Sequence, residues 1–153
     1  MKKFLAMMVV SVLALVGCNQ AESSTDTQEM KDSFQTLEKA QKIEVYAGDV
    51  MLYTIQQEEV GIFADHQQVD KWEPVSSLPK DIVKEHEYVF YQEETLKLGE
   101  KREPNRPMYE TARLRTYKDV PYVTFAVSFM KLEMTFNMKV PEETREYLAR
   151  RSF

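Results

Sequence analysis

Cysteine, histidine and glycine are scarce in this chain of 153 residues. It contains one cysteine, two histidines and four glycines. A single cysteine excludes a disulfide within the chain, so stability must come from a packed core. The few glycines exclude a glycine-rich phosphate-binding loop, and the serines lack the Gly-x-Ser-x-Gly context of a hydrolase nucleophile. His66 and His86 belong to no metal-binding motif. We therefore expect no catalytic residue and no metal site.

An excess of positive charge is also missing. The formal net charge is −5. Residues 1–17 hold two of the 20 basic residues and none of the 25 acidic ones, so residues 18–153 carry a formal charge of −7. Nucleic-acid binding needs a basic surface, and an acidic domain is not attracted to anionic lipid. We therefore predict that nucleic acid is not a partner.

Among the features that are present, the N-terminus is the most informative. Lys2 and Lys3 are followed by an uncharged run over residues 4–16, and Gly17 and the only cysteine, Cys18, come directly after it. A membrane-spanning helix needs about 20 apolar residues, so this run is too short to cross a bilayer. Its layout is that of an export signal. An ordinary secretory signal that happens to precede a cysteine is the alternative.

The sequence Leu15-Val16-Gly17-Cys18 resembles the lipobox of bacterial lipoproteins, in which Leu, a small or branched residue, and Gly or Ala precede Cys. The resemblance covers only the first eighteen residues. It implies a diacylglyceryl thioether on Cys18, with chains such as palmitate and with or without an added N-acyl chain, and cleavage after Gly17. Because two acyl chains hold a protein stably on a bilayer, it implies a lipid-anchored protein on the extracytoplasmic side of a cell membrane. Whether that is an inner or an outer membrane stays open.

We predict three parts: a cleaved signal peptide (1–17), a lipidated cysteine with a flexible polar tether (18–40), and a single α+β domain (41–153). Residues 19–28 lack any sizeable apolar side chain, so they cannot offset the entropy of ordering. A flexible chain of about 20 residues spans roughly 25 Å on average and at most near 70 Å. A weak helical pattern over 30–42 predicts a frayed helix that leads into the domain.

Strands and helices alternate in the predicted domain. Runs rich in β-branched and aromatic residues flank Gly48-Asp49, which predicts a β-hairpin. Val60, Phe63 and Gln67 lie at helical spacing before Pro74, which predicts an inserted helix. The expected elements are strands at 43–47 and 50–56, a helix at 57–72, strands at 87–98 and 109–117, further strand from about 122 to 140, and a C-terminal helix at 141–151.

The apolar phase slips by one residue near the end of the chain. Apolar side chains occupy odd positions from Val123 to Phe129 and even positions from Met130 to Val140. Either a tight turn or a β-bulge in one long strand explains the slip. Because residues 128–131 lack Gly, Asn, Asp and Pro, we favour the bulge. Long strands that bend at bulges suit a curled sheet, so we predict a strongly coiled antiparallel sheet of five or six strands.

Two groups of residues indicate a binding surface. Tyrosine and tryptophan are common in this small domain, and such rings suit interfaces and ligand clefts, although strand propensity also favours them. A basic group stands out in an acidic protein, but glutamates interrupt it, so a solvated mixed surface is the alternative. The predicted interaction surface comprises Tyr88, Tyr91, Tyr109, Arg102, Arg106, Arg113 and Arg115.

These observations favour a non-enzymatic lipoprotein whose domain binds an envelope protein or another envelope component. One alternative is a carrier or sensor in which the coiled sheet encloses a small apolar ligand, similar in architecture to lipocalin-like lipoproteins. Another is an enzyme that acts on envelope polymers, which would require Asp65, His66 or His86 to converge in a pocket. No cofactor is expected apart from the covalent lipid on Cys18.

Overall fold

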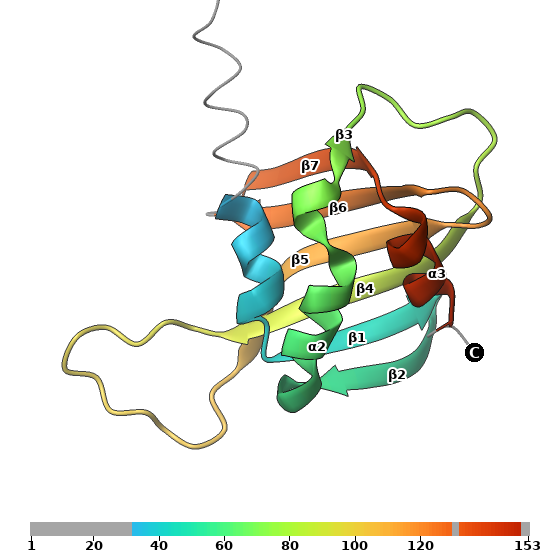
Figure 1. Cartoon of the computed structure of the whole chain (residues 1–153). Helices are drawn as coiled ribbons and strands as arrows, with labels where there is room; N and C mark the ends of the chain where they lie inside the picture. The colour runs from blue at the N-terminus through green and yellow to red at the C-terminus, as the bar shows by residue number, and fades with distance from the viewer. Residues whose placement is uncertain (1–31, 130–131, 151–153) are drawn as a thin grey trace, which may run out of the picture.

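A computed structural model describes residues 32–129 and 132–150 of the chain. It is an α+β structure with one antiparallel sheet of seven strands and helices packed against it (Figure 1). A helix over residues 32–39, here called the N-terminal segment, precedes the first strand. The elements that follow are β1 (Lys42–Ala47), β2 (Val50–Gln56), α2 (Gln57–Gln67), the 3-10 helix η1 (Val69–Lys71), β3 (Glu73–Pro74), β4 (Lys84–Glu93), β5 (Met108–Tyr117), β6 (Tyr122–Phe129), β7 (Leu132–Lys139) and α3 (Glu142–Arg150).

The order of strands in the sheet differs from their order in the chain. The spatial order is β2-β1-β4-β5-β6-β7-β3. The β1–β2 hairpin forms one edge, α2 then carries the chain across the sheet, and β3 pairs with β7 at the other edge (Figure 1). The chain returns to place β4 beside β1, and β4 to β7 follow as a meander. This crossover brings β1 and β4 together although about 40 residues separate them.

The α+β class, the antiparallel sheet, the inserted helix and the C-terminal helix are confirmed. The strand number is corrected from five or six to seven, and the strongly coiled form that we predicted is not supported, because the sheet is open with β2 and β3 at its edges. Sequence patterns missed β3, which has two residues and includes Pro74. Proline lacks a backbone donor and is tolerated at a sheet edge.

The bulge that we favoured near Met130 is wrong. β6 and β7 are separate antiparallel strands, paired from Tyr122–Lys139 to Phe129–Leu132. With two residues between the strands, each odd-numbered residue of β6 faces an even-numbered residue of β7, as in the pairs Val123–Met138 and Phe125–Phe136. The phase slip therefore keeps the apolar side chains of both strands on one face of the sheet.

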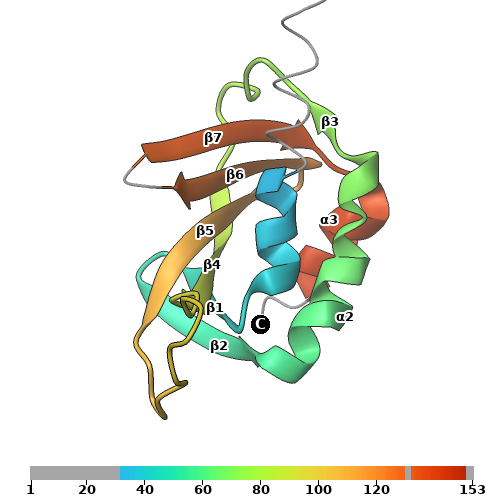
Figure 2. The same cartoon turned by 90° about the vertical axis from the view of Figure 1, so that its left-hand side faces the viewer.

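The helices lie on one face of the sheet and enclose the core (Figure 2). Phe63 of α2 is fully buried, with ring centroids 5.4 Å from Tyr88 and 6.1 Å from both Phe90 and Tyr147. Phe34 of the N-terminal segment packs on Trp72 and Phe125 at 5.1 and 5.2 Å. The N-terminal segment is therefore part of the packed core, although it falls within the predicted tether.

Hydrogen bonds fix the end of α2. We predicted that this helix runs to Trp72, but it ends at Gln67 because Gln68 adopts a left-handed conformation with φ of 48°. The carbonyl of Gln67 accepts hydrogen bonds from Trp72 Nε1 at 2.7 Å and from Thr144 Oγ1 of α3 at 2.9 Å. These contacts join the end of α2 to α3 and to Trp72, the residue that precedes β3. In the part of the chain that the structure describes, no helix has the length and apolar character needed to span a bilayer.

Candidate functional site

The face of the sheet opposite the helices, here called the open face, carries a concentration of ionised and tyrosine side chains. Strand alternation sends Ile43, Val45, Tyr88 and Phe90 into the core beneath the helices. The residues between them must point to the other side, which the helices leave uncovered (Figure 2). The open-face residues of β1, β4 and β5 are Lys42, Glu44, Tyr46, Glu87, Val89, Tyr91, Arg113 and Arg115.

Glu44 is the centre of one group on the open face. Its carboxylate accepts hydrogen bonds from Lys42 Nζ at 2.8 Å and from Tyr46 OH at 2.6 Å. These bonds lower the pKa of Glu44 and raise that of Tyr46. Burial, together with the charge and hydrogen bond of Glu44, raises the pKa of Tyr91 to about 12. Lys42 Nζ also lies 4.5 Å from the centroid of the Tyr91 ring, which is a cation–π distance.

Glu87 is the centre of a second group. It is only 7% exposed, and its carboxylate lies 2.8 Å from Lys84 Nζ, 2.9 Å from Arg115 Nε and 3.4 Å from Arg113 Nη1. Burial by itself raises the pKa of Glu87, but the hydrogen bonds from Lys84 and Arg115 and the nearby positive charges outweigh it, so the pKa falls to about 2. Arg113 also pairs with Glu110, whose hydrogen bonds raise the pKa of the guanidinium.

A hollow of about 270 Å³ lies where the two groups meet. Glu87 and Arg113 are held in one protonation state near neutral pH by their ion pairs, so the hollow offers fixed charges and hydrogen-bonding groups beside aromatic rings. Tyrosine and arginine are among the side chains that contribute most often to binding energy at protein interfaces. The hollow is lined by Tyr46, Gly48, Asp49, Glu87, Val89, Tyr91 and Arg113.

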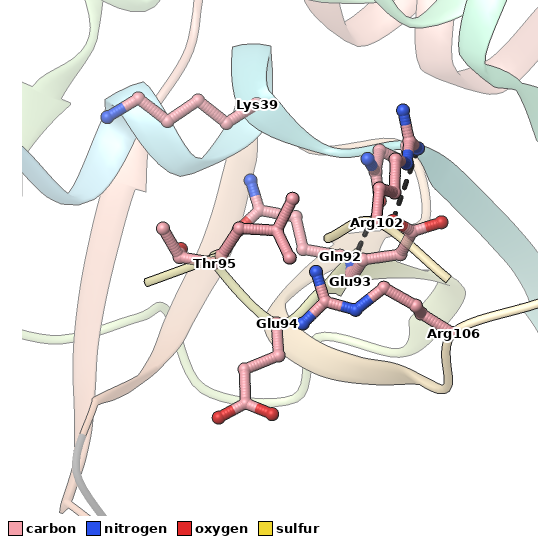
Figure 3. Close-up of a pocket in the computed structure, with 9 residues that line it drawn as sticks. Lys39, Gln92, Glu93, Glu94, Thr95, Arg102 and Arg106 are labelled. Carbon is pink, nitrogen blue, oxygen red and sulfur yellow. Dashed lines mark hydrogen bonds and ion pairs between the residues drawn. The ribbon is translucent and has the colours of Figure 1, made fainter. Parts of the chain in front are cut away.

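A second hollow, of about 310 Å³, lies where β4 ends and the long loop over residues 94–107 begins (Figure 3). Arg102 Nη2 donates to Glu93 at 3.2 Å, and the backbone N–H of Glu93 donates to Gln41 Oε1 at 2.8 Å. Arg106 also lines this hollow and is half-buried. Within the described residues, its guanidinium has no ion-pair or hydrogen-bond partner.

The residues of the predicted interaction surface lie in separate places on the structure. Tyr91, Arg113 and Arg115 lie on the open face, whereas Arg102 and Arg106 line the loop hollow. Tyr109 is exposed at the start of β5, where it pairs with Gln92.

Tyr88 does not belong to any surface, so its assignment to the interaction surface is corrected. The side chain is fully buried beneath α3, and its hydroxyl donates to the carbonyl of Leu148 at 3.1 Å. Strand propensity and core packing therefore explain why a tyrosine stands at this position. The predicted lipid-attachment residue Cys18 and the signal residues Leu15, Val16 and Gly17 lie outside the described residues.

Sequence reasoning missed the charged partners on the open face. None of Lys42, Glu44, Tyr46 and Glu87 is among the predicted site residues. The available signal was strand alternation, since Lys42, Glu44 and Tyr46 are separated by the apolar Ile43 and Val45. That pattern places the three on one face but does not indicate that β4 is the neighbouring strand.

The residues required by the enzyme hypothesis do not converge. Asp65 and His66 are exposed on α2, where His66 stacks on Tyr147 with ring centroids 4.3 Å apart. His86 is instead buried on β4, and burial lowers its pKa. Among residues 32–129 and 132–150, no three histidine, cysteine or acidic side chains are grouped as metal ligands.

Comparison with known proteins gave no relative: no protein-family model, no curated protein sequence and no solved structure matches this chain.

Proposed function

We propose that this protein is a non-enzymatic lipoprotein, anchored through Cys18 on the extracytoplasmic side of a cell membrane, whose domain binds another envelope component through the open face. The observation that carries the binding role is the hollow between the Glu44 and Glu87 groups, on a sheet face that none of the helices in the described part of the chain covers. Tyr46 and Tyr91 provide amphipathic rings there, and Arg113 provides a guanidinium.

A protein or other polymeric partner suits this site better than a small apolar ligand. The carrier hypothesis needs a sheet that closes around an apolar cavity, but this sheet is open, and its apolar face is occupied by side chains from the helices. The open face is lined by charged and hydroxyl groups, which favours a partner that offers complementary hydrogen bonds along several strands.

Site-directed photocrosslinking in intact cells tests the binding role. A photoreactive amino acid at Asp49, which is exposed and lines the hollow, is expected to give a defined adduct. The same probe at Ile62, which is exposed on α2, is the matched control and should give none. The substitution Tyr46→Ala should weaken the Asp49 adduct. Adducts of equal yield from both positions, or from Ile62 alone, would contradict a partner on the open face.

Substitution of Cys18 by serine tests the anchor. The serine variant is expected to lose the diacylglyceryl mass and the cleavage after residue 17, because the thioether cannot form on an oxygen. Mass spectrometry of membrane-extracted protein measures both properties. A serine variant that is processed and retained on the membrane as firmly as the parent protein rules out lipidation as the anchor.

A further inference from the structure

Exposed apolar side chains gather at one end of the sheet. This end, here called the loop end, is where β4 leads into the 94–107 loop, where β5 begins, and where β6 and β7 meet. Figure 2 views the molecule from this side. Of the nine large apolar side chains that are exposed in the described residues, five lie here: Leu96, Leu98, Met108, Tyr109 and Leu132. Single exposed apolar residues are ordinary, whereas a group of them marks a contact surface.

The 94–107 loop presents Leu98 at a turn. The backbone N–H of Glu100 donates to the carbonyl of Lys97 at 3.0 Å, and the backbone N–H of Lys97 donates to Glu100 Oε2 at 3.0 Å. Gly99 provides the positive φ of 92° within this turn. The Leu98 side chain is therefore held away from the domain, and it is fully exposed.

The chain also enters the domain on this side. The N-terminal segment lies along the loop end, and its Lys39 lines the same hollow as Leu96 and Arg106 (Figures 1 and 3). Only the thirteen residues 19–31 separate Cys18 from this segment, and the chain between them can span at most about 50 Å. A lipid on Cys18 would thus keep the start of this segment, and the loop end beside it, within reach of the bilayer.

We propose that the loop end rests on the membrane, with Leu96 and Leu98 inserted at the bilayer interface. This inference depends on the proposed lipid anchor. Lys97 lies between the two leucines and Lys101 follows Leu98 by three residues, and long basic side chains can keep their charges at headgroup depth while their stems lie against apolar surface. The guanidinium of Arg106, which has no partner among the residues that the structure describes, can donate hydrogen bonds to a phospholipid phosphate.

Two leucines would hold an untethered domain only weakly on a membrane. The lipid anchor compensates for this weak binding, because it keeps the loop close to the membrane at a high effective concentration. A weak insertion of the two leucines is then sufficient to orient the domain. The orientation would leave the open face of the sheet accessible to a partner from the side.

A fluorophore at position 98 tests the inference in the full, lipidated protein. With Cys18 acylated, Leu98→Cys adds the only free thiol, which can carry an environment-sensitive dye. The control is Val83→Cys, because Val83 is 63% exposed and directly precedes β4, at the opposite end of the sheet from the 94–107 loop. In phosphatidylcholine vesicles, we expect a blue shift and several-fold stronger quenching by brominated lipids at position 98 than at position 83.

The outcomes separate this inference from the proposed function. One dye per chain, flotation with the vesicles and equal quenching at both positions would overturn the membrane contact while the anchor stands. Two dyes per chain with no flotation would overturn the anchor and the inference together. A blue shift at position 98 in native membranes that is absent from pure lipid vesicles would also refute the lipid contact and assign the loop end to a protein.

Discussion

The ion pairs of Glu87 should make a measurable, pH-dependent contribution to stability. The pKa of Glu87 is about 2, compared with an ordinary value of 4.5. Each unit of pKa difference corresponds to about 1.36 kcal/mol, so the difference corresponds to about 3 kcal/mol in the free energy of unfolding. The variant Glu87→Gln keeps the shape of the side chain and removes its charge, and we expect it to be less stable than the parent protein by about this amount at pH 7.

The sign of the pH dependence follows from the direction of the shift. A carboxyl group with a lowered folded-state pKa stabilises the protein fully above its unfolded pKa, and this contribution is lost as the pH falls through the folded value. The stability difference between the parent protein and Glu87→Gln should therefore be constant above about pH 5.5 and shrink towards zero as the pH approaches 2. Because the other carboxyl groups titrate in the same way in both proteins, their contributions to the free energy of unfolding cancel in this difference.

Urea unfolding provides the assay, since the only tryptophan, Trp72, is buried in the core and reports on unfolding by fluorescence. Glu133→Gln is the matched control. Glu133 is an exposed carboxylate on β7 with no ion pair in the described part of the chain. That variant should differ from the parent protein by less than about 0.5 kcal/mol at any pH. A Glu87→Gln effect that is equally large at pH 7 and near pH 2.5 would refute the reasoning, because the cost would then come from packing and not from charge.

Three further predictions concern single positions. Tyr91→Phe should remove the tyrosinate absorbance step centred near pH 12 from an ultraviolet titration of the folded protein, and an unchanged step at that pH would show that another tyrosine produces it. Phe63→Ala should lower the free energy of unfolding by about 3–5 kcal/mol in urea titrations, because the fully buried ring contacts β4 and α3, and a loss below 1 kcal/mol would contradict that packing. Gly61→Ala should raise the melting temperature by removing a flexible residue from the interior of α2, whereas Gly48→Ala should lower it because Gly48 has a φ of 60°. Both positions have open space for a methyl group, so the backbone conformation alone should decide the sign of each shift. Shifts of the same sign at the two positions would contradict this explanation.

Local patterns predicted most of the elements because the forces that define them act over a few residues. The β1–β2 hairpin follows from Gly48-Asp49 between two β-rich runs, and α3 follows from Pro141, the acids of its first turn and the arginine of its last. The 123–140 region shows the limit of such reasoning. The phase slip was visible in the sequence, but a bulge and a two-residue turn produce the same slip, and only the pairing of Phe125 with Phe136 distinguishes them.

The candidate site was predicted only in part for a similar reason. Tyr91, Arg113 and Arg115 were identified from residue type, but Glu44 and Glu87 have no distinctive sequence context. Their role depends on β4 lying between β1 and β5, which is a property of the crossover and not of any one strand. Tyr88 failed as a surface residue because residue type does not state which face of a strand is covered.

The order of residues along the chain was enough to predict the class of the fold, the placement of most strands and helices, and the resemblance of the N-terminus to a lipoprotein signal, since each depends on the chemistry of neighbouring residues. The tertiary structure decided which strands are neighbours, which sheet face the helices cover, and how the acids and bases of β1, β4 and β5 combine. Those properties arise from contacts between residues far apart in the chain, whose free energy depends on the packing of the whole domain.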